Sequence, residues 1–165
     1  MDLKRVFRHL SIGSFRVRAL FPAASLDRIT AAIAATESRH HGEIRFAVEA
    51  SLHPAQVLKG MTARERAVTV FGELRVWDTE ANNGVLIYLL LADRDVEILA
   101  DRGVHAKVGS AGWESICQSM EAEFRQGRFE EGALRGIEAV GRHLREHFPS
   151  RGGDINELPD RPVLL

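Results

Sequence analysis

The chain has 165 residues, of which 45% are hydrophobic and 27% are charged, and its formal net charge is −1. This composition is typical of one globular domain with a buried core, and it excludes a disordered or fibrous protein. The near-zero charge gives no electrostatic footprint for nucleic acid, so we expect no nucleic-acid partner. The single cysteine, Cys117, excludes an internal disulfide framework and indicates a reducing compartment.

Residues 1–20 form a basic leader that carries five Lys and Arg residues and one acid. Arginines interrupt each apolar stretch, so the leader lacks the continuous apolar region of a secretory signal. The longest apolar run, Val85–Ala92, is far shorter than the ~20 residues that span a bilayer. We therefore expect a cytoplasmic protein. Two interpretations of the leader stay open: a solvated segment packed on the domain, or a surface for an anionic membrane or a membrane-protein partner.

The first predicted elements after the leader alternate between helix and strand. Apolar residues three and four apart predict a helix over residues 25–39. Alternating polar and apolar residues over 43–50 predict a half-buried strand. Thr62 and Glu65 have the spacing of a capping box, which predicts a helix running to about Val76.

The second half of the chain predicts a strand pair and two helices. Residues 85–92 are apolar on both faces, which indicates a central strand, and 96–101 form the next strand. The short polar connection between them requires an antiparallel hairpin. Apolar periodicity then predicts helices over 110–126 and 129–147, before residues 150–165, a flexible tail or extended arm.

The predicted order is therefore α-β-α-β-β-α-α. A helix between the first two strands makes them parallel, so the expected fold class is α/β, a three-layer α/β/α sandwich on a small mixed central sheet. The expected organisation is a basic leader (1–20), one α/β domain (21–149) and a flexible tail (150–165).

Polar residues gather at one end of this predicted sheet. In a hairpin, Asp101 at the exit of one strand lies beside the entrance of the other, where Asp78, Asn82 and Asn83 precede the strand. Carboxylate and carboxamide oxygens suit Ca²⁺ or Mg²⁺, and Glu43 is placed to join them. The competing interpretation is ordinary turn chemistry, because Asn-Asn-Gly and Asp-Arg-Gly are common at strand ends.

The other polar groups are weaker candidates for a functional site. Asp93 and Asp95 lie at the opposite sheet end, about 20 Å from Asp101. His143 and His147 fit the H-x-x-E-H pattern of inverted zinc peptidases, but a catalytic zinc needs a further protein ligand that the short downstream segment does not offer. Cys117 lies on an apolar helical stripe and is predicted to be a buried small hydrophobe.

Several blocks resemble the TPM domain family over about residues 20–148. They are Gly42–Phe46, Trp77-Asp78-Thr79, Asn82–Ile87, Asp93–Gly103 and Gly127-Arg128-Phe129. The resemblance implies an α/β/α fold and a divalent-cation site in loops at the sheet edge, with Asp78, Asn82, Asn83 and Asp101 as the matching positions. It also implies acid phosphatase activity as described for plant members, whereas typical members are exported or anchored by a transmembrane helix.

Two functions follow as hypotheses. The first is a non-catalytic cation-binding or interaction module, which requires only the oxygen cluster. The alternative is a metal-dependent phosphomonoester hydrolase, with Arg102 or Arg94 as phosphate clamps. The sequence offers plausible ligands but no nucleophile–base pair, which favours the module.

Overall fold

The computed structural model describes residues 2–150, 152 and 155–165. Four residues of the predicted leader and tail (1, 151, 153 and 154) lie outside the described residues. The elements in chain order are α1 (Leu3–Ser11), α2 (Ser14–Leu20), α3 (Ala23–Glu37), β1 (Glu43–Glu49), α4 (Pro54–Leu58), α5 (Ala63–Glu73), β2 (Gly84–Leu90), β3 (Asp95–Ala100), α6 (Arg102–Arg125), α7 (Phe129–His147) and β4 (Val163–Leu164).

The sheet has the strand order β3-β2-β1-β4. β1 and β2 are parallel and β2 and β3 antiparallel, which confirms the predicted mixed sheet and its hairpin. β4 adds a parallel strand beside β1, with Ala47 opposite Val163. The hairpin register places Val85 opposite Ala100, so the start of β2 and the end of β3 lie at the same sheet end.

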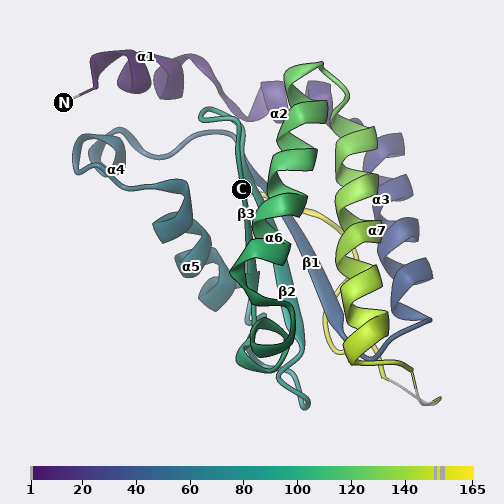
Figure 1. Ribbon diagram of the computed structural model, residues 1–165. Helices are drawn as coiled ribbons and strands as arrows, with labels where there is room; N and C mark the ends of the chain where they lie inside the picture. Colours follow the sequence, from purple (N-terminus) through teal and green to yellow (C-terminus); the bar gives the residue numbers. More distant parts are fainter. Residues whose placement is uncertain (1, 151, 153–154) are drawn as a thin grey trace.

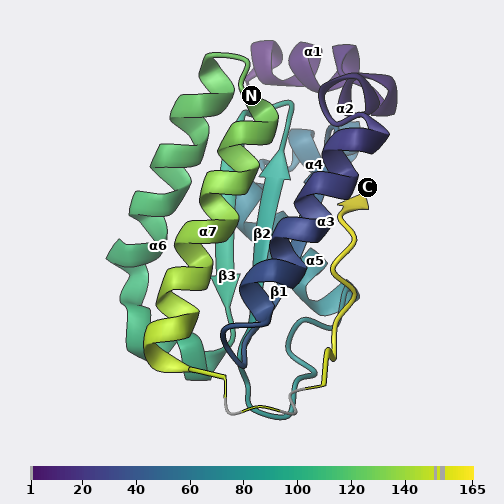
Figure 2. The ribbon, with the colours of Figure 1, turned by 90° about the vertical axis from the view of Figure 1, so that its right-hand side faces the viewer.

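Helices cover both faces of the sheet, which confirms the three-layer α/β/α sandwich (Figures 1 and 2). The larger core lies between the sheet and α2, α3, α6 and α7, and its sheet residues include Phe46 and Ile87. The smaller core lies on the other face, where α4 and α5 pack on side chains such as Leu86 and Tyr88. All seven residues of β2 are buried, as expected of a central strand with no polar face.

The prediction of a half-buried β1 is wrong, because every residue of this strand is buried. On the polar face, Glu49 accepts hydrogen bonds from the Tyr88 hydroxyl at 2.7 Å and Arg66 Nε at 2.8 Å. The Arg45 guanidinium donates to the Pro159 carbonyl. Charged side chains with hydrogen-bond partners are therefore buried where the period of two predicted exposure.

Residues 102–108 are helical, which the sequence did not predict. Gly109 has φ 74° and ψ 166°, so α6 has a kink there and its second part starts at Ser110, the predicted helix start. The Asp101 side chain caps the first part by accepting the Arg102 amide.

The two ends of the chain are more structured than predicted. The leader forms α1 and α2, and its Val17 is buried in the larger core. The assignment of residues 150–165 to a flexible tail does not fit its described part. Leu158 is 7% exposed and Val163–Leu164 pair with β1, so 155–165 is an extended arm. No helix among the described residues is long and apolar enough to cross a membrane.

Candidate functional site

Asn83 and Asp101 are neighbours across the β2–β3 hairpin. The Asp101 amide donates to the carbonyl of Gly84, the residue after Asn83, at 2.8 Å. The strand register thus places Asp101 opposite Gly84, so two of the four predicted ligands lie at the same end of the hairpin.

Asn83 is fully buried, at 0% exposure. Its Nδ2 donates to the His41 carbonyl, and its backbone amide donates to Thr79 Oγ1 at 3.1 Å. The His41 carbonyl fixes the orientation of the side-chain amide, because a flipped amide would set two oxygens against each other. The remaining atom, Oδ1, is buried and has no hydrogen-bond partner among the described residues.

Asp101 also has a buried side-chain oxygen without a hydrogen-bond partner among the described residues. It is 8% exposed, and its Oδ1 accepts the Arg102 amide at 2.6 Å, whereas Oδ2 is buried and lacks a partner in the described part of the chain. A buried oxygen left without a partner costs about 1–3 kcal/mol. Both oxygens belong to residues at the same end of the β2–β3 hairpin.

The other two predicted ligands lie in the connection that leads into β2. Asp78 and Asn82 are both exposed. Asn82 has a left-handed backbone, with φ 51°, and its carbonyl oxygen lies 2.7 Å from where a Cβ on Gly103 would be. Glycine at 103 therefore permits close contact between this connection and the start of α6.

Glu43 does not extend the oxygen cluster. Its carboxylate accepts the amides of Glu157 at 3.2 Å and Leu158 at 3.1 Å, so it holds the C-terminal arm. Burial raises the pKa of the Glu43 carboxyl, although these two amides act in the opposite direction. The expectation that Glu43 joins the predicted ligands is wrong, because the arm uses both oxygens.

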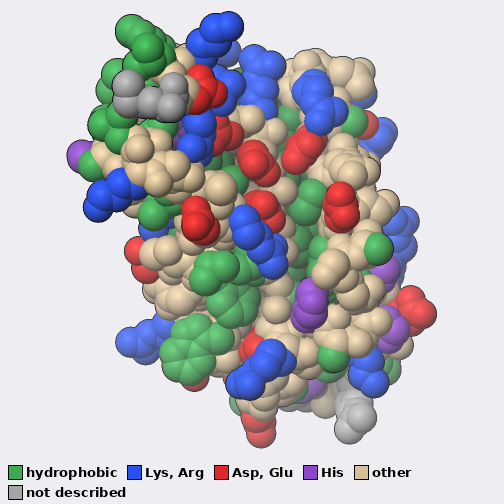
Figure 3. Space-filling model, turned by 60° about the vertical axis from the view of Figure 1, so that its left-hand side comes forward, with side chains coloured by type: hydrophobic (Ala, Val, Ile, Leu, Met, Phe, Trp, Pro, Cys, Tyr) green, Lys and Arg blue, Asp and Glu red, His purple; other side chains and the backbone are tan. Residues whose placement is uncertain are grey.

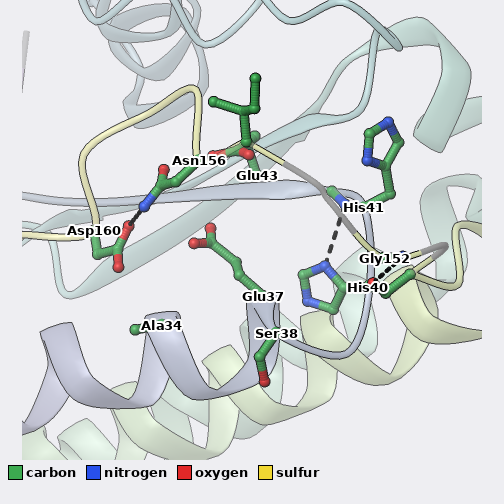
Figure 4. A pocket seen from close by; sticks show the side chains of 12 residues that line it. Ala34, Glu37, Ser38, His40, His41, Glu43, Gly152, Asn156 and Asp160 are labelled. Atoms are coloured by element: carbon green, nitrogen blue, oxygen red, sulfur yellow. Dashed lines mark hydrogen bonds between the residues drawn. The ribbon is translucent and has the colours of Figure 1, made fainter.

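A pocket of about 390 Å³ opens at this sheet end, between α3, the start of β1 and the C-terminal arm (Figure 4). Glu37 points into it between Glu43 and Asp160 (Figure 4). The Glu37 carboxylate accepts the Ile44 amide at 2.8 Å. Burial, and then the charges of Glu43 and Asp160, raise the pKa of Glu37 to about 9, so this carboxyl is neutral at neutral pH.

His40 and His41 lie on the pocket wall nearest to Asn83. His40 Nδ1 accepts the Gly42 amide at 3.2 Å, which leaves Nε2 to donate to Thr36 Oγ1 at 3.3 Å. Burial lowers the pKa of His40 to about 4, so the imidazole is neutral and shapes the loop. The His41 carbonyl links this loop to Asn83.

The H-x-x-E-H segment forms a possible metal-ligand group. Within the described residues, His143, Glu146 and His147 each offer one ligand atom within 4.8 Å of the others. The His143 ring packs edge-on against Trp113, with centroids 5.6 Å apart, and burial lowers its pKa. In zinc peptidases with this pattern the glutamate acts as the general base and is not a metal ligand. Here Glu146 lies in one ligand group with the two histidines, so the group does not match a peptidase centre.

Of the remaining candidates, Arg102 adjoins Asp101 and the others lie away from it. Asp93 and Asp95 lie at the far end of β3 from Asp101, and Asp93 binds Arg5 and Arg8. Burial raises the pKa of the Cys117 thiol to about 12, so it is a protonated, weakly reactive group. Arg94 belongs to the far turn, and Arg102 is exposed in the first turn of α6.

Sequence reasoning missed two residues of the site. Thr79 is 7% exposed and fixes the backbone of Asn83 through its hydroxyl. His41 contributes its carbonyl oxygen, which no side-chain pattern can reveal. For Thr79 the signals were the polar turn composition and its place in the Trp77-Asp78-Thr79 block that resembles the family.

Comparisons with known proteins show the family and the fold. The family model of the TPM domain matches residues 17–143. The chain belongs to the TPM domain family. The NMR structure of the BA42 protein from the psychrophilic bacterium Bizionia argentinensis is similar, with a TM-score of 0.76 and 31% identity over 87% of this chain and 94% of that one.

A second solved structure shares the fold of this TPM domain. It is the N-terminal domain of a protein from P. gingivalis, with a TM-score of 0.63 and 21% identity over 78% of this chain and 81% of that one. No curated protein is significantly similar to the chain.

Proposed function

We propose that this TPM domain is a non-catalytic module that binds one divalent cation, Ca²⁺ or Mg²⁺, between β2 and α6. The observation that carries the proposal is the pair of buried oxygens without partners, Asn83 Oδ1 and Asp101 Oδ2. An oxygen donor set with one carboxylate suits a hard cation. The exposed Asp78 and Asn82 side chains belong to the adjoining connection and are candidates to complete the coordination.

Burial of the two oxygens supports a bound ion over a bound substrate. Asn83 is completely buried and Asp101 nearly so, which suits an ion without leaving room for a phosphomonoester. An enzyme of this type requires an open coordination position beside a cleft and a group that activates water. Glu37 lines the neighbouring pocket, but the Ile44 amide holds one of its carboxyl oxygens.

A titration of ¹⁵N-labelled protein with Ca²⁺ and then Mg²⁺ tests the proposal. The Asn83 side-chain amide reports on the Asn83 side chain itself. The Arg102 backbone amide reports on Asp101, because it donates to the Asp101 carboxylate. We expect the largest shift changes at these two groups. Unchanged spectra with both cations, or changes confined to His143 and His147, would show that the site does not bind hard cations.

The phosphomonoester hydrolase remains the alternative, and the same sample tests it. We expect no release of p-nitrophenol from p-nitrophenyl phosphate at saturating cation. Turnover by the parent that is lost in Asp101→Asn would show that the domain is a phosphomonoester hydrolase and would contradict the non-catalytic module.

A further inference from the structure

The amphipathic helix α1 packs on the domain with its polar face inward. Arg5 and Arg8 donate to the Asp93 carboxylate at 2.7–3.2 Å, and Arg5 also donates to the Met61 carbonyl at 2.7 Å. His9 is 3% exposed, accepts the Leu52 amide on Nδ1 at 3.0 Å, and lies 3.1 Å from Asp93 through Nε2. These charged and polar contacts fix the rotation of α1 about its own axis.

The apolar face of α1 consequently points to solvent. Leu3, Phe7 and Leu10 recur at i, i+4 and i+7, on the side of the helix away from Asp93, and are 57%, 71% and 62% exposed. Phe15 on α2 is 83% exposed. Most amphipathic helices on a globular domain bury the apolar face, so this reversed arrangement leaves an apolar surface for another partner.

Exposed cations lie on the same two helices as this apolar surface. Lys4, Arg16 and Arg18 are exposed, and Asp2 is the one acid within residues 1–20 of the sequence. Hydrophobic side chains over α1 lie next to Lys and Arg side chains on the face shown in Figure 3. Exposed Phe and Leu bordered by Lys and Arg are the features of helices that lie in the headgroup region of anionic bilayers.

We propose that α1 and α2 form a membrane-surface anchor that binds anionic phospholipid through Leu3, Phe7, Leu10 and Phe15, with Lys4, Arg16 and Arg18 on the headgroups. The charge of the surface favours lipid over a second copy of this chain, because two copies would bring these cations together. The Asp93 contacts hold the helix on the domain while its apolar face enters the bilayer.

Sedimentation of the full chain with vesicles tests this anchor. Phosphatidylcholine vesicles, with and without about one third phosphatidylglycerol, separate the apolar from the electrostatic contribution. We expect binding to the anionic vesicles and weak binding to the neutral ones. Equal binding to both would overturn the electrostatic part of the proposal, and binding to neither would overturn all of it.

Three variants assign the binding to residues. Phe7→Gln with Leu10→Gln should lower the partition coefficient at least roughly tenfold, because two apolar side chains no longer enter the bilayer. Arg16→Gln with Arg18→Gln should lower it about fivefold per cation on anionic vesicles. Val68→Gln, at a residue 56% exposed on α5, is the matched control and should bind as the parent does.

Light scattering without lipid tests the competing occupant. We expect a monomer for the parent and for each variant, with unchanged circular dichroism. A parent dimer that dissociates in Phe7→Gln/Leu10→Gln would show that a second copy covers the surface, and would overturn the lipid proposal.

Discussion

The amide of Asp101 and the carbonyl of Gly84 form a 2.8 Å hydrogen bond that ends the β2–β3 hairpin. This bond sets Asp101 opposite Gly84, the residue after Asn83, and both Asn83 Oδ1 and Asp101 Oδ2 are buried without a partner in the described chain. The same Asp101 also caps α6 through its other oxygen. Asp101 therefore links the sheet, α6 and the proposed cation site. A substitution at Asp101 must change one of these roles and leave the others intact.

Close packing at the start of β2 predicts a specific sensitivity to Gly84→Ala. The new Cβ would lie 2.0 Å from the Val76 carbonyl oxygen, a backbone atom that no rotamer change can move. We expect the free energy of unfolding, measured by chemical denaturation, to fall by about 1–3 kcal/mol. The substitution should also displace Asn83.

Gly72→Ala is the control for that substitution. Gly72 lies inside α5 and a Cβ there would meet nothing within 4 Å. We expect stabilisation of about 0.5–1 kcal/mol, because alanine is the better helix former. Equal effects of the two substitutions would contradict the close approach of Val76 to Gly84.

The raised pKa of Glu37 predicts a change of stability with pH. Burial holds the folded-state pKa at about 9, above the ordinary 4.5, so the neutral carboxyl is the stabilising form. Its contribution is complete below about pH 4.5 and is lost as the pH rises through 9. Glu37→Gln keeps an oxygen for the Ile44 amide and should remove this loss.

Thermal melts between pH 5 and 9 measure the effect. We expect Glu37→Gln to melt at least about 2–4 °C above the parent at pH 8, which corresponds to ~1 kcal/mol, with a smaller difference at pH 5. Glu80→Gln is the control, since Glu80 is exposed in the connection that leads into β2. A parallel pH profile for Glu37→Gln and the parent would refute the assignment.

The Asp93 contacts predict how α1 is released from the domain. Burial raises the pKa of Asp93, but the stronger combined effect of Arg5, Arg8 and His9 holds it below its usual 3.8. The ion pairs therefore stabilise docking above about pH 3.8, and this stabilisation is lost as the pH falls through the depressed pKa.

Hydrogen exchange of the α1 peptide checks this docking. Asp93→Asn should raise its exchange at pH 7, because the arginines lose their charged partner. Glu97→Gln, which removes only the exposed pair with Arg64, should leave it unchanged. If α1 exchanges equally fast in the parent and in Asp93→Asn, the helix is not held by these contacts.

Sequence patterns predicted β1, β2, β3, α3, α5, α7 and the second part of α6, because their apolar periods are strong, but they did not predict α1, α2 or α4. The hairpin around residues 93–95 followed from loop length, and it correctly placed Asp101 beside the entrance to β2. The pairing of β4 with β1 could not be predicted, since Val163–Leu164 is too short to show a period. The burial of Arg45 could not be predicted either, because its hydrogen-bond partners lie in the distant C-terminal arm.

The candidate site was only partly accessible to sequence reasoning. Residue types and turn positions placed Asn83 and Asp101 at one sheet end, but they also suggested Glu43, whose oxygens hold the arm. The orientation of the Asn83 amide depends on the backbone carbonyl of His41, 42 residues earlier. Such backbone contacts across the chain leave no mark in spacing or composition.

Thermal melts of the parent and of Asp101→Asn, with chelator and with Ca²⁺ or Mg²⁺, test the central claim most directly. Asparagine retains the capping oxygen for α6 but removes the charge, so the variant should fold normally. A cation at 100 times its Kd adds about 2.7 kcal/mol, and we expect the parent to melt about 5–10 °C higher with it. Asp101→Asn should lose most of this rise, whereas His143→Ala should keep it. An identical rise in the parent and Asp101→Asn, or no rise in the parent, would contradict a cation site at Asn83 and Asp101.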